Sequence, residues 1–317
     1  MLYRLGIDLG GTNIAVGVVD ENFNIVAKSS TKTNAPCYAS ELLDSMEKVC
    51  RDVVQQVGLE LSDIASIGIG SPGCVDSNKG TVVASGNLKI KDFHICQEIE
   101  QRLGIKSYLE NDANAATYGE FIAGAGKGMR NFAIMTLGTG VGIGVIIDKK
   151  IFSCRNNKGG ELGHSTMVVD GEPCQCGRRG CIEAYASATA LVKQTIAAME
   201  KNADSLMWQI AGNLQNVDGR TAFEAMKQGD ETALSVVKQY MKYVAVAYLN
   251  TDAAFKLDAI CIGGGISGEG DKLATFIYDY IKNTNQRPAD APICVAKLGN
   301  DAGIIGAANL YKLHKGE

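Results

Sequence analysis

Two distant segments of this chain align without a gap and share one pattern. Leu9–Asp20 and Leu137–Asp148 both read as a strand, a glycine-containing turn, a second strand and an aspartate. The length of the match favours an internal duplication, although glycine-containing hairpins can also resemble one another by chance. Two related halves, each with such a hairpin, predict that the phosphates of a nucleotide are held between two domains.

The bulk composition agrees with two folded domains. The chain has 317 residues, which exceeds the usual size of one compact core, and 46% of them are hydrophobic, which excludes a disordered chain. The boundary is expected within residues 119–127, where a helix gives way to the sequence Gly-Ala-Gly-Lys-Gly. We therefore expect an N-terminal domain over residues 1–120 and a C-terminal domain over residues 121–300.

Charge and cysteine usage exclude several classes of partner. The formal net charge of −4 argues against nucleic acid or an anionic membrane. The N-terminus runs directly into a strand-like segment with no secretory signal, and no uncharged stretch is long enough to span a bilayer. Ten cysteines without a signal peptide indicate a reducing compartment, so we expect a cytoplasmic protein.

Hydrophobic periodicity predicts the main secondary-structure elements. The expected strands are 3–8, 14–19, 25–31, 64–70, 105–110, 132–137, 141–147, 258–262 and 293–296. The expected helices are 40–57, 112–123, 182–199, 222–228, 232–255, 272–281 and 303–313.

The two hairpin turns have the residues needed to bind phosphate. Glycine lets backbone N–H groups approach an anion closely, a threonine hydroxyl adds a donor, and Asp8 can hold Mg²⁺ through water. A third glycine run follows the strand at 258–262 and could let adenine and ribose lie against bare backbone, or could be a tight structural connection. The predicted nucleotide-binding residues are Asp8, Gly10, Gly11, Thr12, Gly138, Thr139, Gly140, Gly264 and Gly265.

Asp112 is the candidate catalytic base. It lies in Glu110-Asn111-Asp112-Ala113-Asn114-Ala115, where a strand meets a helix. N–H groups at a helix N-terminus stabilise a carboxylate, and an ionised aspartate can accept the proton of a hydroxyl that attacks a γ-phosphorus. From its position alone, Asp112 could equally be only a helix cap.

A histidine and three cysteines have the spacing of a closed metal site. His164, Cys174, Cys176 and Cys181 fit H-x₉-C-x-C-x₄-C. Three thiolates and one imidazole complete a tetrahedral Zn²⁺ shell, which indicates a structural ion that fixes a loop. Glu161 and Glu183 flank this loop; they are candidate acceptors for sugar hydroxyls, or simply surface charges.

Together these segments resemble the ROK family of bacterial sugar kinases and repressors, and within it the glucokinases. The resemblance covers essentially the whole chain. The matching stretches are Asp8–Thr12, Ser71–Gly73, Glu110–Ala115, Leu137–Gly142, Gly160–His164, Cys174–Glu183 and Ile262–Gly265.

The resemblance implies a fold, an activity and a set of site residues. The fold would be the actin-like ATPase fold (ribonuclease H-like), with two α/β domains, a ligand cleft between them, and a C-terminal helix at about 301–317 that completes the first domain. The activity would be phosphorylation of a hexose by MgATP, and the protein would be a homodimer or homotetramer. The implied sugar contacts are Gly73, Asn87, Asn111, Asp112, Glu161, His164 and Glu183.

One departure leaves the sugar open. The glucokinases of this family usually have a tryptophan shortly after the residue equivalent to Asn87, where this chain has Ile90. Glucose is the preferred expectation, and N-acetylmannosamine, N-acetylglucosamine, fructose and allose remain alternatives.

Two other classes are less consistent with the sequence. A sugar-responsive repressor would carry a helix-turn-helix before the first hairpin, where this chain has seven residues. An actin-like structural ATPase would give the Cys–His loop and its acids no purpose.

Overall fold

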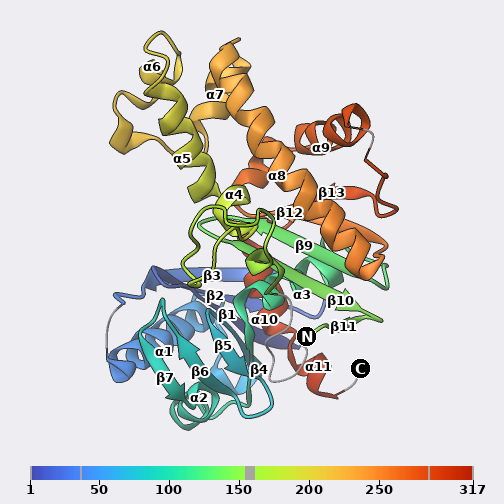
Figure 1. Ribbon diagram of the computed structural model, residues 1–317. Helices are drawn as coiled ribbons and strands as arrows, with labels where there is room; N and C mark the ends of the chain where they lie inside the picture. The colour runs from blue at the N-terminus through green and yellow to red at the C-terminus, as the bar shows by residue number, and fades with distance from the viewer. Residues whose placement is uncertain (1, 36–37, 154–160, 285, 316–317) are drawn as a thin grey trace. The chain divides into compact units, whose positions relative to one another are not determined.

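The computed structural model describes residues 2–35, 38–153, 161–284 and 286–315, and its contacts divide the chain into two compact units (Figure 1). Unit 1 comprises Met1–Arg130, Gly144–Gly160 and Lys297–Glu317, and unit 2 comprises Asn131–Ile143 and Glu161–Ala296. The expected domain limits at residues 120 and 300 stay a prediction. Within the described ranges, no helix combines the length and hydropathy needed to cross a membrane.

Unit 1 is built on a five-stranded sheet in the order β3-β2-β1-β4-β8. Its strands are β1 (Tyr3–Leu9), β2 (Asn13–Val19), β3 (Ile25–Lys32), β4 (Ile64–Ser71) and β8 (Ser107–Asn111). β1 pairs antiparallel with β2 and β2 with β3, whereas β1, β4 and β8 run parallel. The carboxyl ends of these three parallel strands therefore meet at one edge, which in open α/β sheets is where ligands bind.

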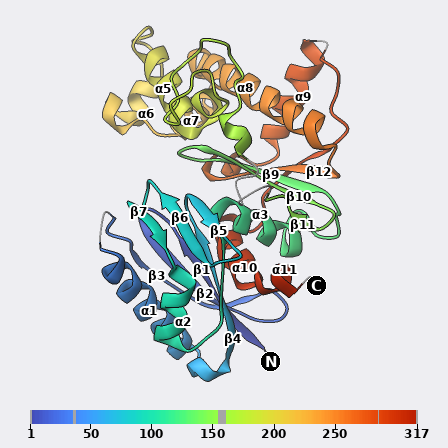
Figure 2. The ribbon, with the colours of Figure 1, turned by 60° about the horizontal axis from the view of Figure 1, so that its bottom comes forward.

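Helices cover both faces of this sheet (Figure 2). On one face lie α1 (Ala39–Gln56) and α2 (Ile95–Leu103), and on the other α3 (Asp112–Ala123) and α10 (Ala302–Ala308). As the apolar spacing predicted, α1 buries Leu42, Met46 and Val53.

The α10 helix approaches the sheet very closely, and glycine makes this possible. A Cβ atom on Gly6 would lie 1.9 Å from the carbonyl oxygen of Ile304, and one on Gly68 would lie 1.7 Å from that of Ala307. The last part of the chain thus packs backbone to backbone on β1 and β4.

Several elements differ from the sequence-based expectation. A three-stranded sheet, β5 (Cys74–Asp76), β6 (Thr81–Ser85) and β7 (Ile90–Phe93), was not predicted. Its strands have only three to five residues, which is too short to give a clear two-residue period. The expected helix at 303–313 is two helices, α10 and α11 (Tyr311–Lys315).

The second sheet repeats the strand order of the first. Its order is β11-β10-β9-β12-β13, so that in both sheets the order is third, second, first, fourth and fifth strand. Here β12 pairs parallel with β9 and with β13, and β10 pairs antiparallel with β11, as the corresponding strands do in the first sheet. The two sheets therefore share one topology, as the predicted duplication requires. The strands are β9 (Phe132–Leu137), β10 (Val141–Ile147), β11 (Lys150–Ile151), β12 (Ala259–Gly263) and β13 (Ile293–Val295).

Most of unit 2 is helical. The expected helix at 182–199 is interrupted at Ser187, whose side chain caps the second half by accepting from the N–H of Ala190. Its α-helices are α4 (Glu183–Ala186), α5 (Ala188–Met199), α6 (Met207–Ala211), α7 (Thr221–Lys227), α8 (Glu231–Phe255) and α9 (Lys272–Asn283). Described 3₁₀ turns of the chain are η1 (Leu61–Asp63), η3 (Glu161–His164), η4 (Leu214–Asn216), η5 (Gly265–Glu269) and η6 (Gly299–Asp301).

Candidate active site

Asp112 is the first residue of α3, directly after β8. Asn111 caps this helix: its side-chain oxygen accepts from the N–H of Ala113 at 3.0 Å and of Asn114 at 3.2 Å. A carboxylate oxygen of Asp112 accepts from the N–H of Ala113 at 2.8 Å. The cap therefore holds a carboxylate at the positive end of a helix, where its charge is stabilised.

The side chain of Asn111 also fixes Gly73. Its amide nitrogen donates to the carbonyl oxygen of Gly73 at 3.2 Å. Gly73 has a φ of +98°, and a Cβ atom there would lie 2.4 Å from the carbonyl oxygen of Ala84. Only glycine fits this position, so Gly73 and Asn111 form a rigid pair beside Asp112.

Glu110 is a buried carboxylate that sequence reasoning did not assign to the site. One oxygen accepts from the N–H of Asn111 at 2.8 Å and from the side-chain amide of Asn114 at 3.0 Å, and the other accepts from the hydroxyl of Ser77 at 3.1 Å. It supports the residues on both sides of Asp112. The feature of the sequence that indicates Glu110 is an acidic residue at the end of a strand, directly before Asn111 and Asp112.

Asp8 and Asp112 lie close enough to influence each other. Asp8, near the end of β1, pairs with Gly70 of β4, and a Cβ atom on Gly70 would lie 3.5 Å from the Cα of Asp112. Burial, reinforced by the negative charge of Asp112, raises the pKa of Asp8 to about 6. No Lys or Arg ion pair involves Asp8 among the described residues, so a cation at this edge would relieve the repulsion between the two acids.

The first of the two predicted phosphate-binding hairpins lies at the same edge. The N–H of Gly10 donates to the carbonyl oxygen of Asn13, and Thr33 braces the turn because its hydroxyl donates to the carbonyl oxygen of Gly10 at 2.7 Å. A Cβ atom on Gly11 would lie 3.3 Å from that of Asn87. The predicted phosphate turn and the predicted sugar contact Asn87 are therefore neighbours within unit 1.

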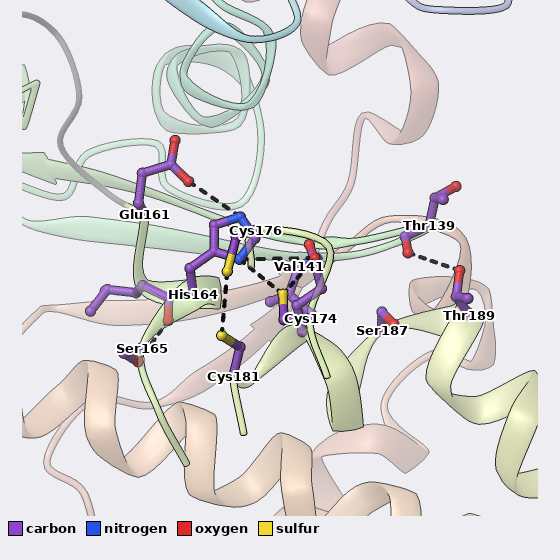
Figure 3. Close-up of polar contacts among 12 residues, drawn as sticks. Thr139, Val141, Glu161, His164, Ser165, Cys174, Cys176, Cys181, Ser187 and Thr189 are labelled. Carbon is purple, nitrogen blue, oxygen red and sulfur yellow. Dashed lines mark hydrogen bonds and ion pairs between the residues drawn. The ribbon is translucent and has the colours of Figure 1, made fainter. Parts of the chain in front are cut away.

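The second hairpin, at Gly138–Gly140, is held by the start of α5. The N–H of Ala188 donates to the carbonyl oxygen of Gly138 at 2.8 Å. The hydroxyl of Thr189 donates to the carbonyl oxygen of Thr139, also at 2.8 Å (Figure 3). Gly264, with a φ of +79°, lies against this hairpin, since a Cβ atom there would be 2.6 Å from the carbonyl oxygen of Leu137. The structure thus brings the predicted phosphate and adenine turns of unit 2 together.

Glu183 lies between this hairpin and the Cys–His cluster. One of its oxygens accepts from the N–H of Val141 at 3.1 Å, and the other lies 3.6 Å from the sulfur of Cys174 and 3.9 Å from Nδ1 of His164. Nε2 of the same histidine lies 3.8 Å from a carboxylate oxygen of Glu161. Both acids therefore face His164.

The four predicted metal ligands converge. The ligand atoms of His164, Cys174, Cys176 and Cys181 all lie within 4.8 Å of one another (Figure 3). Nδ1 of His164 is 3.5 Å from the sulfur of Cys174, and the sulfurs of Cys176 and Cys181 are 3.6 Å apart. Tetrahedral coordination with metal–sulfur bonds of about 2.3 Å places two sulfurs roughly 3.7 Å apart, so the cluster fits one metal ion.

Local backbone geometry also suits a metal. A hydrogen bond from the backbone N–H of Arg178 is the main cause that lowers the pKa of Cys176 to about 7, which favours the thiolate that a metal requires. Gly180 has a φ of +74°, and a Cβ atom there would lie 1.7 Å from the carbonyl oxygen of Val168.

Comparison with known proteins identifies the relatives of this chain. A family model described as the ROK family matches residues 4–314. A glucokinase of Streptomyces coelicolor is 36% identical over 315 residues, with 97% of each protein covered. An N-acetylmannosamine kinase of Vibrio cholerae is 29% identical over 314 residues, with 97% of this chain and 99% of that protein covered.

Among solved structures, one relative is a ROK family glucokinase from Streptomyces griseus in complex with glucose and AMPPNP. It has a TM-score of 0.84 and 32% sequence identity, over 97% of this chain and 98% of that one. The predicted actin-like α/β fold class is confirmed.

The pKa of Asp8 predicts a pH-dependent stability. Because the folded-state pKa is raised to about 6 from 3.8, ionising Asp8 costs about 3 kcal/mol more in the folded than in the unfolded chain. This cost is complete above pH 6, falls as the pH drops toward 4, and is absent below the unfolded pKa. In Mg²⁺-free buffer, Asp8→Asn is expected to increase the unfolding free energy by about 3 kcal/mol at pH 8 and by about half of that at pH 5. Urea denaturation measures the unfolding free energy. If Asp8→Asn increased it equally at pH 8 and pH 5, the raised pKa of Asp8 would be contradicted.

The Cys–His cluster predicts one metal ion per chain. Cys176→Ser is expected to lose that ion and about 2 kcal/mol or more of stability, which corresponds to a decrease in Tm of roughly 4–8 °C. Elemental analysis and thermal melts provide the measurements. Cys74→Ser, outside the cluster, is the control and is expected to retain the metal. The site would be ruled out if the wild-type protein contained no metal and the Tm of Cys176→Ser equalled that of the wild type.

Proposed function

Because the chain belongs to the ROK family, we propose that it is an ATP-dependent glucokinase, which transfers the γ-phosphoryl group of ATP to the 6-hydroxyl of glucose. The observation that carries the proposal is the position of Asp112, which the Asn111 cap holds at the start of α3 beside Gly73 and Asp8.

In the proposed reaction, Asp112 acts as the general base. Its carboxylate accepts the hydroxyl proton while the sugar oxygen forms a bond to the γ-phosphorus and the bond to the β–γ bridging oxygen breaks, releasing ADP. Asn111 positions Asp112 through the helix cap, and Glu110 holds the backbone and side chain of the neighbouring asparagines. Little other covalent chemistry is required of the protein.

Glucose would be bound through hydrogen bonds to its hydroxyls. Amide and carboxylate groups suit a ligand that offers a donor on nearly every carbon. The proposed contacts are Gly73, Asn87, Asn111, Asp112, Glu161, His164 and Glu183. Of these, Glu183 also holds the hairpin at Val141.

The proposed nucleotide contacts are the glycine turns. Backbone N–H groups of Gly10, Gly11, Gly138 and Gly140, with the hydroxyls of Thr12 and Thr139, would bind phosphate. Gly264 and Gly265 would face adenine and ribose. The buried carboxyl of Asp8, whose ionisation is unfavourable without a cation, fits Mg²⁺; bound Mg²⁺ would neutralise charge on the phosphates.

The metal at the Cys–His cluster is proposed to be Zn²⁺, because three thiolates and one imidazole suit that ion. Its proposed role is structural. We further propose a cytoplasmic homodimer or homotetramer that acts in carbohydrate metabolism, at the entry of glucose into glycolysis. The expected domain arrangement, 1–120 with 301–317 and 121–300 with a dimer surface on the second domain, belongs to the same proposal.

A panel of sugars tests the substrate. In a coupled ADP-release assay with MgATP, we expect kcat/KM to be highest for glucose. N-acetylmannosamine is the second candidate, because a kinase for that sugar is 29% identical over nearly the whole chain. N-acetylglucosamine and fructose complete the panel. No turnover with any sugar would end the proposal, and a preference for an N-acetylated sugar would reassign the substrate.

Asp112→Asn tests the base. This substitution retains the shape of the side chain but removes the basic oxygen, so kcat is expected to fall by about 10²–10⁴-fold. Glucose affinity, measured by calorimetry, should change little. Asp52→Asn, an exposed acid on α1, is the matched control. Near wild-type turnover in Asp112→Asn would remove Asp112 from this role.

A further inference from the structure

A pocket lies within unit 1, next to the segment that carries Asp112. Its volume is about 320 Å³, which is sufficient for a small metabolite. Four parts of unit 1 line it: the turn after β5, the end of β8, the turn between β10 and β11, and the C-terminal residues around α11. None of the residues predicted for the nucleotide or the sugar lines this pocket.

The charged residues of the lining are mostly basic. Lys149, Lys150 and Lys312 line the pocket, and among the described residues Glu110 is the one acid that does so. Among the described residues, no carboxylate forms an ion pair with Lys149 or Lys150. The pocket therefore has a surplus of ammonium groups, which suits a dianion.

The turn that carries two of these lysines is fixed. Asp148 and Lys149 have φ values of +51° and +65° and join the paired residues Ile147 and Lys150. Consecutive residues with positive φ are characteristic of the tight type I′ hairpin turn. Arg130 anchors the turn through an ion pair with Asp148 at 2.6 Å, and its carbonyl oxygen accepts from the N–H of Lys149 at 2.9 Å.

The pocket wall also contains neutral polar groups and Glu110. Ser77 and Asn78 offer hydrogen bonds to hydroxyls, and the Ser77 hydroxyl donates to Glu110. Lys149 and Lys150 lie at the turn between β10 and β11, and the neutral polar groups and Glu110 lie at the turn after β5 and the end of β8. A ligand that carries both an anionic group and hydroxyls would match these two parts of the wall.

Glu110 links the pocket to the candidate base. The same carboxylate that faces the pocket accepts from the N–H of Asn111 and from the side chain of Asn114, one on each side of Asp112. Any ligand that shifts Ser77 or Glu110 would therefore act on the cap that positions Asp112.

We propose that this pocket binds a phosphorylated sugar, with the phosphate at Lys149 and Lys150, and that its occupancy alters turnover through Glu110. The effect on turnover rests on the proposed kinase activity. The binding site rests only on the geometry of unit 1. A hexose phosphate is the class of product that the proposed reaction would release, so the pocket offers a means of product regulation.

Binding is tested directly and without turnover. Glucose 6-phosphate is titrated calorimetrically into protein saturated with glucose and Mg·AMPPNP, so that the candidate active site is occupied. Lys149→Gln/Lys150→Gln is expected to weaken binding by about tenfold or more. Lys48→Gln/Lys127→Gln removes the same charge from exposed positions of unit 1 and is expected to leave it unchanged. Thermal melts confirm that both variants are folded.

Each outcome decides the proposal. No binding to the wild type, or equal binding to both double variants, overturns the site. Inorganic phosphate that binds as tightly as glucose 6-phosphate overturns a sugar-phosphate ligand and assigns the pocket to free phosphate.

Turnover decides the coupling separately. Glucose 6-phosphate is expected to change kcat at saturating glucose and ATP in the wild type, and to have a much smaller effect in Lys149→Gln/Lys150→Gln. Binding to the pocket with no effect on kcat overturns the coupling through Glu110. If glucose does not bind when the protein is saturated before the titration, the proposed glucokinase function is contradicted. That result differs from a failure of glucose 6-phosphate to bind, which contradicts only the pocket.

Discussion

The cap that Asn111 places on α3 is the interaction on which the candidate chemistry depends. One short side chain accepts from two helix N–H groups and donates to Gly73, while Glu110 holds its backbone from the buried side. Asp112 is then the first helical residue, with few conformations open to its backbone. The position of Asp112 is therefore set largely by the residues around it, Asn111 and Glu110 above all. Its hydrogen bond with the N–H of Ala113 joins it only to the next residue of the chain.

In unit 2 the Cys–His cluster and the phosphate hairpin share one support. Glu183 contacts the cluster through one oxygen and Val141 through the other, and α5 begins a few residues later and holds Gly138 and Thr139. A metal in the cluster would therefore fix the hairpin as well as its own loop. On the proposed function, such an ion would support nucleotide binding without lying among the reacting atoms.

The sequence predicted those parts of the molecule that depend on local rules. The hairpins, the helix that begins at Asp112 and the grouping of one histidine with three cysteines follow from turn chemistry, capping and ligand spacing, which a few consecutive residues determine. The β5–β7 sheet and the break at Ser187 were missed because their patterns are short. The supporting contacts of Glu110 with Ser77 and of Glu183 with Val141 could not be inferred, since only the tertiary fold brings these residues together.

The close packing of α10 on Gly6 and Gly68 has a consequence for biosynthesis. The part of that face that α10 covers stays open until residues 302–308 follow the first strands out of the ribosome. At synthesis rates of about 5–20 residues per second, this delay is roughly 15–60 s. Throughout that time the part of the sheet that α10 will cover stays exposed, and transiently exposed apolar surface makes a growing chain prone to aggregation.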